Sequence, residues 1–270
     1  MNIVVKLIRK FQTDQVSETG AQLTYFLILS IFPFLIALLH ILQFTPLADG
    51  ETLRKLLVAL PTASQKVIVN LVEEVVGTSH TTLFSISILT ALWSSSSGML
   101  ALIKSVNRAY DLKETRSYIT LRLLSLVMTI GLILMIVVSL SLTNIEKYLF
   151  QLKLLQQLEN HSFLIKMIHL IFVVILLTLI LSFLYYIAPA RKRLRFVYSV
   201  PGAFFATMGM LLSSLIFSVY VNNFANYSKV YGSLGGVIIL LVWLYMISMI
   251  VILGAELNSI LIEDKEWENV

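Results

Sequence analysis

The residues of this sequence that could do chemistry are polar side chains set within or beside long apolar stretches. The densest set is the run Trp93–Gly98, whose four serine hydroxyls either hydrogen-bond across a close helix contact or line a polar groove. A charge at the centre of a membrane helix costs about 2.5–3.5 kcal/mol, so charges gather at helix ends. Glu256, with Asn258, lies at such an end. It forms either a structural clamp with Lys104 or Arg108, or part of a substrate site.

These positions define three sets of candidate residues. The candidate groove or rim residues are Tyr25, Ser30, Ser94, Ser95, Ser97, Asn107, Tyr231, Glu256 and Asn258. The basic residues expected at the inner rim, where they would attract an anionic headgroup, are Lys104, Arg108, Arg191 and Arg193. The residues expected to kink a helix or to let two helices pack closely are Pro33, Gly98, Pro201, Gly232 and Gly236.

Motifs of common enzyme classes are missing from the sequence. It contains no GxxxxGK[ST] phosphate-binding loop, no HExxH, no GxSxG and no cysteine. The four histidines are scattered along the chain, so convergence on a metal ion is not expected. Asp111 and Glu114, three residues apart, are more typical of a solvated helix face than of a metal-binding pair. We therefore expect no catalytic residue, no metal ion and no cofactor.

The elements that position these residues follow from composition. Hydrophobic residues make up 58% of the 270 residues, charged residues only 13%, and mean hydropathy is +0.88. This number of charged residues is too small to supply the polar surface of a soluble protein of this size. The chain is therefore expected to be an integral membrane protein. Period-2 alternation is absent, which disfavours a β-barrel and favours an all-α bundle.

Six apolar segments are each long enough to cross a bilayer, at about 33 Å for about 22 residues in a helix. They lie near 23–44, 83–105, 121–142, 166–188, 198–220 and 234–255. The segments are spread evenly, so residues 1–270 are expected to form a single membrane domain with six transmembrane helices.

Lys and Arg residues predict the orientation. With both termini in the cytoplasm, thirteen of the 20 basic residues lie inside and seven outside, as the positive-inside rule requires. The short basic loop 191–195 contributes most to this bias. We expect a multi-pass protein of the cell membrane with cytoplasmic N and C termini.

Two segments outside the apolar stretches have helical periodicity. In residues 1–20, Ile3, Val4, Leu7, Ile8 and Phe11 share one helix face. This segment is either an amphipathic helix on the anionic inner leaflet or a cytoplasmic extension of the first membrane helix. The external segment 45–82 is expected to form two short amphipathic helices that either cap a cavity or pack on the bundle.

An ordered set of short stretches resembles a known family across nearly the whole chain. The stretches are Ala21–Phe26, Leu29–Phe34, Leu92–Gly98, Asn107–Tyr110, Tyr186–Pro189, Pro201–Ala203, Tyr231–Gly236, Trp243–Tyr245 and Gly254–Asn258. They resemble the YihY/virulence factor BrkB family of membrane proteins; segment 45–82 and the tail after Asn258 depart from the pattern. The resemblance implies a six-helix inner-membrane protein linked to serum resistance and to lipid handling. The family was formerly labelled ribonuclease BN, a label widely regarded as a misassignment.

The expected function is that of a transporter or lipid translocase without its own ATPase, with membrane lipids, including anionic headgroups, as partners. The alternative is a non-catalytic scaffold for envelope machinery, acting as a homo-oligomer or with an envelope protein partner. A ribonuclease is disfavoured, and nucleic acid is not an expected partner. The basic inner surface has no histidine, few aromatic residues and no clustered carboxylate pair for a metal.

Overall fold

The computed structural model describes residues 2–43, 65, 81–150, 162–190, 195–223 and 234–268. Within these ranges every regular element is a helix, which confirms the all-α prediction. The helices are α1 (Ile3–Thr13), α2 (Val16–Gln43), α5 (Thr81–Ala109), α6 (Tyr118–Phe150), α7 (Ser162–Ile187), the short 3-10 helix η2 (Phe196–Ser199), α8 (Val200–Asn223) and α10 (Gly235–Glu268).

A long helix occupies each of the six segments that the sequence marks as apolar. In the described part of the chain, four stretches are long and apolar enough to cross a membrane: Tyr118–Met135, Leu170–Ile187, Phe196–Val221 and Gly235–Glu263. They belong to α6, α7, α8 with η2, and α10. Membrane crossing by α2 and α5, and so the total of six, stays a prediction. The external segment 45–82 lies outside the described residues, apart from residue 65 and the start of α5.

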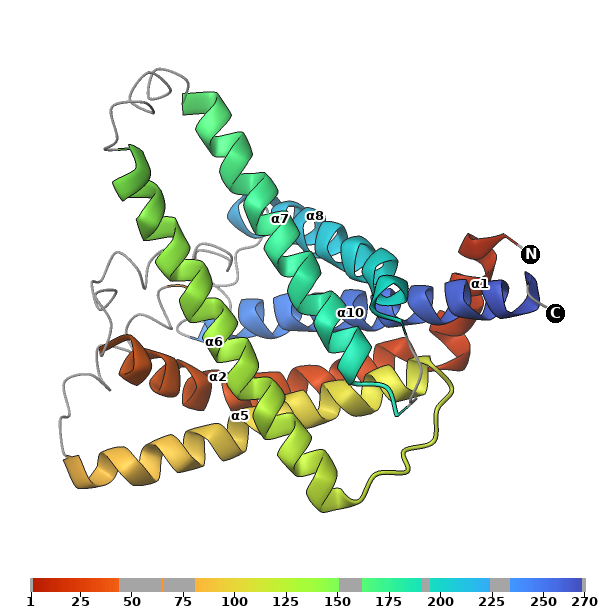
Figure 1. Cartoon of the computed structure of the whole chain (residues 1–270), viewed down its shortest axis with the longest axis horizontal. Coiled ribbons are helices and arrows are strands. Elements are labelled where there is room, and N and C mark those ends of the chain that lie inside the picture. Colours follow the sequence, from red (N-terminus) through yellow and green to blue (C-terminus); the bar gives the residue numbers. More distant parts are fainter. Residues whose placement is uncertain are drawn as a thin grey trace.

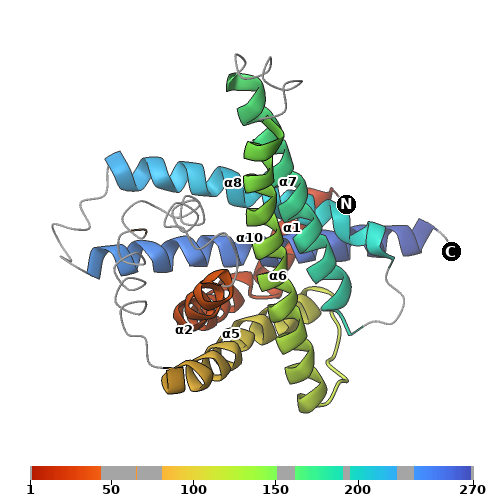
Figure 2. The same ribbon diagram turned by 60° about the vertical axis from the view of Figure 1, so that its left-hand side comes forward.

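The helices pack around α10, which contacts α1, α2, α5, α8 and η2. Figures 1 and 2 show α2 and α5 side by side, with α6 crossing them at a steep angle, while α7 crosses α8 and α10. The largest core cluster joins α5, α6, α7, α8 and α10. Its fully buried members include Ile103, Val106, Tyr185, Ala206 and Ala255. Small residues on α8 and α10 let those two helices approach closely, as is usual for helices in membranes.

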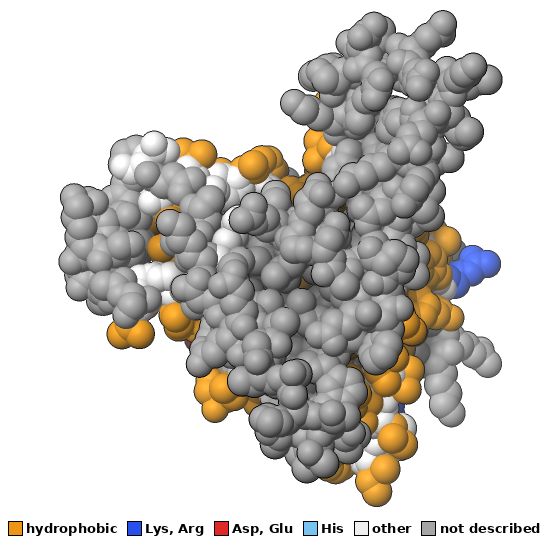
Figure 3. Space-filling model, turned by 90° about the vertical axis from the view of Figure 1, so that its left-hand side faces the viewer, with side chains coloured by type: hydrophobic (Ala, Val, Ile, Leu, Met, Phe, Trp, Pro, Cys, Tyr) orange, Lys and Arg blue, Asp and Glu red, His pale blue; other side chains and the backbone are white. Residues whose placement is uncertain are grey.

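The outer surface of the helices is apolar where a soluble protein would be polar. The most exposed large hydrophobic residues on α6 and α8 include Leu123, Val127, Leu134, Leu215 and Ile216. On the face drawn in Figure 3, hydrophobic side chains likewise dominate the surface of the described residues. Such a surface is stable against hydrocarbon and unstable in water. The apolar exterior supports the prediction of an integral membrane protein.

α8 and α10 cross at two glycines, Gly202 and Gly254. A Cβ atom at Gly254 would lie 2.7 Å from the carbonyl oxygen of Gly202 and 2.6 Å from the hydroxyl of Tyr185. Asn258 closes the same contact, since its Oδ1 accepts from Gly202 N at 2.7 Å and its Nδ2 donates to Ser199 O at 3.0 Å. Pro201 precedes this crossing in the first turn of α8, where proline needs no backbone partner.

Residues 3–13 form a helix of their own, so their interpretation as an extension of the first membrane helix is wrong, whereas residues 16–20 do extend that helix. α1 is capped by Asn2, whose Oδ1 accepts from Val4 N at 3.3 Å. It ends at Asp14–Gln15, where Gln15 has a left-handed φ of 51° that breaks the helix before α2 begins. Figure 1 shows α1 beside the C-terminal part of α10, at one end of the molecule.

Candidate functional site

The serine run of α5 forms most of its hydrogen bonds within its own helix. Ser95 Oγ donates to Leu92 O at 3.2 Å, and the hydroxyls of Ser96 and Ser97 donate to Trp93 O at 2.8 and 3.2 Å. Two of these serines also bond to another helix: Ser94 donates to Leu29 O of α2 at 3.3 Å, and Ser97 Oγ accepts from Arg122 Nη1 of α6 at 3.2 Å. Such internal bonds satisfy hydroxyls in an apolar setting.

Gly98 lies where α5 meets α2. A Cβ atom at this position would lie 3.1 Å from Ser30 Oγ and 3.5 Å from Leu27 Cδ2. Ser30 is buried there and donates to Leu27 O at 2.9 Å. The small residue lets the two helices approach closely over this turn, and the serine run continues from that contact toward α6.

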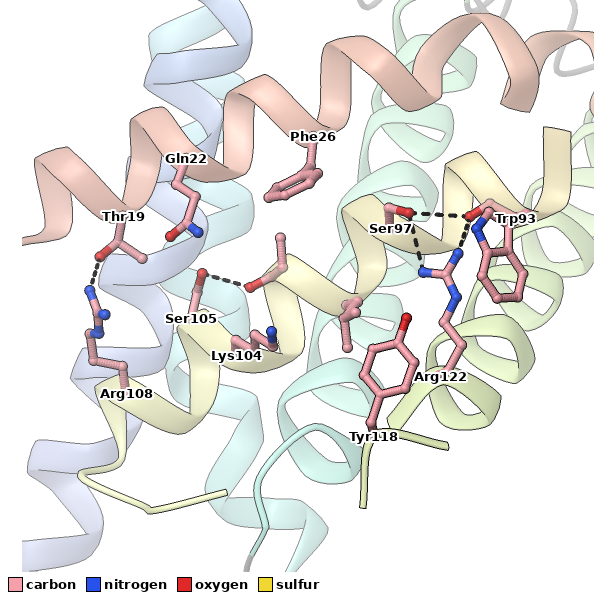
Figure 4. Close-up of a pocket in the computed structure, with 12 residues that line it drawn as sticks. Thr19, Gln22, Phe26, Trp93, Ser97, Lys104, Ser105, Arg108, Tyr118 and Arg122 are labelled. Atoms are coloured by element: carbon pink, nitrogen blue, oxygen red, sulfur yellow. Dashed lines mark hydrogen bonds between the residues drawn. The ribbon is translucent and has the colours of Figure 1, made fainter. Parts of the chain in front are cut away.

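A pocket of about 350 Å³ opens between α2, α5 and the first turns of α6 (Figure 4). Its polar uncharged lining comes from Thr19, Gln22, Ser97 and Ser105, and its apolar lining from Phe26, Trp93, Leu100, Ala101 and Tyr118. Its charged lining is entirely basic, from Lys104, Arg108 and Arg122. A site with this lining suits an anionic group attached to an apolar body.

Arg122 holds the end of the pocket nearest α6. The side chain is buried; its Nη2 donates to Trp93 O at 2.6 Å and its Nη1 to Ser97 Oγ at 3.2 Å. The guanidinium carbon lies 3.9 Å from the centroid of the Trp93 ring, a cation–π contact. Arg122 Nε has no hydrogen-bond acceptor. A buried guanidinium without a carboxylate partner is costly unless an anion shares the site.

Lys104 and Arg108 lie four residues apart on α5, on the α2 side of the same pocket. Arg108 Nη1 donates to Thr19 Oγ1 of α2 at 2.8 Å (Figure 4). Among the described residues, no carboxylate lies within 4.0 Å of Lys104, Arg108 or Arg122. No neighbouring carboxylate therefore cancels the positive potential of the pocket. An uncancelled positive potential is what attracts an anion.

Glu256 and Asn258 lie away from this pocket, inside α10 rather than at its end. The helix continues to Glu268, and the predicted end of its membrane-spanning part near residue 255 stays a prediction. Glu256 is fully buried and pairs with Lys10 of α1, Nζ to Oε2, at 3.2 Å. The partners expected from sequence, Lys104 and Arg108, face the α2–α5–α6 pocket instead.

Asn107 ties the end of α5 to the loop that follows and to the end of α7. Its Nδ2 donates to Glu114 Oε2 at 2.6 Å, and its Oδ1 accepts from Ala190 N at 2.8 Å. Asp111 and Glu114 lie in this loop, so the expected shared helix face is wrong. Asp111, with a left-handed φ of 52°, turns toward Lys10, while Glu114 binds Arg116 at 2.7 and 2.8 Å.

The Glu114–Arg116 pair gives the stability of this loop a pH dependence. Bonds from Arg116 hold the pKa of Glu114 below its ordinary value despite partial burial, and Asn107 adds to the effect. Because the pKa of Glu114 is lower in the folded than in the unfolded chain, its ionised carboxylate stabilises the fold at pH values above the unfolded pKa. This stabilisation is lost as the pH falls through the folded pKa. We expect Arg116→Met to lower stability by about 1 kcal/mol at pH 7, and the difference to shrink in acid. Thermal unfolding in detergent between pH 7 and pH 3 measures this; a gap that is constant with pH would contradict it.

The other candidate residues are placed as follows. Tyr25 is exposed on α2 and packs edge-to-face on Phe26, with ring centroids 5.4 Å apart. Gly236 is buried in the first turn of α10. Tyr231, Gly232, Arg191 and Arg193 lie outside the described residues, as does the side chain of Pro33. In the described part of the chain, no three His, Asp or Glu side chains are grouped as metal ligands would be.

Sequence reasoning found Ser97, Lys104 and Arg108 but missed Arg122 and Thr19 as members of one pocket. A signal for Arg122 was present, because it is a charge only one turn inside an apolar helix. Its nearness to Trp93 depends on how α6 crosses α5, which the spacing of residues along one helix does not encode.

Comparisons with known proteins identify the family of this chain. The family model described as virulence factor BrkB matches residues 7–269. The chain is 36% identical over 269 residues to a Bacillus subtilis (strain 168) protein named "Putative ribonuclease-like protein YfkH", covering 98% of this chain and 97% of that one.

Two other relatives are named only as UPF0761 membrane proteins. That of Vibrio campbellii is 30% identical over 283 residues, and that of Vibrio atlanticus 29% over 279; both alignments cover 97% of this chain and 83% of the relative. No solved structure matches significantly. The family match across nearly the whole chain, together with an apolar helical bundle, shows that the chain belongs to the virulence factor BrkB family of membrane proteins.

Proposed function

We propose that this protein is a transporter or lipid translocase without its own ATPase, and that its substrate path passes through the α2–α5–α6 pocket. One observation carries the proposal: Lys104, Arg108 and Arg122 converge on a single pocket, and no carboxylate lies among its lining residues. An anionic substrate would supply the missing negative charge.

The remaining lining suits an amphiphile better than a fully polar solute. Trp93 and Tyr118 flank the pocket and are 56% and 65% exposed on the apolar exterior. Indole and phenol rings favour the boundary between headgroups and acyl chains. An anionic headgroup would bind the basic side chains, while the acyl chains would remain in the surrounding lipid.

The proposal places this pocket at the cytoplasmic side of a single six-crossing domain in the cell membrane. Lys104 and Arg108 lie in the last two turns of α5, and Arg122 lies in the second turn of α6. With both termini in the cytoplasm, these helix ends face the anionic inner leaflet. The protein acts in this proposal by facilitated movement of a substrate and not as an enzyme.

The test is lipid flipping by purified protein in liposomes. Fluorescent phosphatidylglycerol is placed in both leaflets, and dithionite added outside bleaches only the outer one. We expect vesicles with protein to lose fluorescence beyond the outer-leaflet fraction, because inner lipids reach the outside. Bleaching equal to that of protein-free vesicles, for anionic and zwitterionic lipids alike, would contradict translocation and favour a scaffold.

A further inference from the structure

The ammonium group of Lys10 reaches from α1 into a ring of oxygen atoms at the junction of α5 and α10. The distances from Nζ are 3.0 Å to Ala109 O, 3.1 Å to Asp111 Oδ2, 3.2 Å to Glu256 Oε2, 3.3 Å to Ser259 Oγ and 3.6 Å to Asp14 Oδ2. Three separate parts of the chain thus hold one side chain of the N-terminal helix.

Within this ring, Glu256 depends on Lys10. Glu256 is fully buried in α10, and no described group donates a well-formed hydrogen bond to its carboxylate oxygens. Lys10 is the only described cation within 4.0 Å of it. Burial opposes the charge on Lys10, but Glu256, Asp111 and Asp14 outweigh this and raise its pKa. α1 therefore supplies the counter-charge for a buried carboxylate of the bundle.

The face of α1 turned away from Lys10 is largely exposed in the described part of the chain. On this face Val4, Val5 and Ile8 are all at least 50% exposed, and α1 has no buried residue. The exposed Arg9 borders this apolar face, whereas Lys6 lies on the Lys10 side of the helix, in a pocket that also contains carboxylates. Exposed branched aliphatic side chains with a basic neighbour, on a helix joined directly to an apolar bundle, match an anionic lipid surface in polarity and charge.

We propose that α1 is a membrane-surface latch: its apolar face binds an anionic lipid surface, and Lys10 fastens the helix to the bundle through Glu256. The lipid surface and the interior of α10 are then coupled through one short helix. This inference holds whatever substrate the bundle carries.

The first experiment tests the lipid contact and uses the absence of cysteine from the chain. Val4→Cys, 59% exposed in the parent, is labelled with an environment-sensitive fluorophore, and the full chain is placed in nanodiscs. We expect blue-shifted emission and protection from aqueous iodide, both stronger with phosphatidylglycerol than with phosphatidylcholine alone. Full iodide quenching in both lipids overturns the proposal. Protection that appears only with two copies per disc also overturns it, in favour of a second copy of the chain.

The second experiment tests the fastening by spin-label distances between Val4→Cys on α1 and Leu215→Cys on α8. Lys10→Met is expected to broaden the distance distribution, whereas Arg9→Met, which removes the same charge from α1, leaves it narrow. Lys10→Arg is expected to restore the narrow distribution. A distribution in Lys10→Met as narrow as in the parent overturns the latch.

A control pair of labels and an independent variant separate the release of α1 from a change in the bundle. The distance between Leu123→Cys on α6 and Leu215→Cys on α8 reports the bundle and is expected to stay constant in every variant. Glu256→Gln removes the other partner and is expected to release α1 as Lys10→Met does, so the latch can be judged even if one variant folds poorly. A narrow Val4–Leu215 distribution in Glu256→Gln contradicts the role of the carboxylate.

Discussion

Arg122→Gln is expected to lower lipid flipping by about 10- to 100-fold while the helical bundle stays folded. Glutamine can still donate a hydrogen bond toward Trp93 O, but it removes the positive charge buried beside the pocket. A hydrogen bond between a charged group and an ionised partner contributes about 1.5–3 kcal/mol, which corresponds to this range. The measurement is the initial rate of dithionite bleaching at equal amounts of reconstituted protein.

Two comparisons separate a role in the pocket from a general loss of charge. Arg195→Gln removes an exposed basic residue just before η2, outside the pocket lining, and is expected to leave flipping near the parent rate. Arg122→Lys keeps the charge without the planar fork, so an intermediate rate is expected. Equal losses in Arg122→Gln and Arg195→Gln would show that bulk surface charge, not the pocket, controls transport.

Gly254→Ala is expected to lower the free energy of unfolding by about 3 kcal/mol, the upper end of the usual cost of overpacking. The added Cβ would lie 2.7 Å from the carbonyl oxygen of Gly202 and 2.8 Å from Ala206 Cβ, so at least one contact is with backbone that cannot rotate away. α8 and α10 would have to separate, which would also strain the bonds from Asn258 to Gly202 and Ser199.

Gly131→Ala on α6 is the matched control for this substitution. A Cβ at Gly131 meets no atom within 4 Å, so alanine there should be neutral or raise stability by up to about 1 kcal/mol through helix propensity. Thermal unfolding of both variants in detergent, followed by helical circular dichroism, gives the comparison. Similar unfolding temperatures for the two variants would contradict the close crossing of α8 and α10.

The sequence determined that the chain is a helical membrane protein, and it located each long helix. With 58% hydrophobic residues, the chain has too few polar residues to cover its surface in water. In lipid, backbone N–H and C=O groups must form their hydrogen bonds within the segment, and an α-helix does this. The positions of α6, α7, α8 and α10 were predictable for the same local reason. The break before α2 was not, because it depends on the left-handed backbone at Gln15, a residue type that does not require that conformation.

Which polar residues meet depends on how the helices cross. Lys104, Arg108 and Arg122 share one pocket, and Glu256 pairs with Lys10 rather than with Lys104 or Arg108, because helix crossings bring distant residues together. Hydrophobic periodicity along a helix shows which face is buried but not which neighbour covers it. The crossing at Gly202 and Gly254 fixes α8 against α10, and the contact of α5 with α6 places Arg122 over Trp93. The site is therefore a product of packing between helices, whereas each helix is a product of its own sequence.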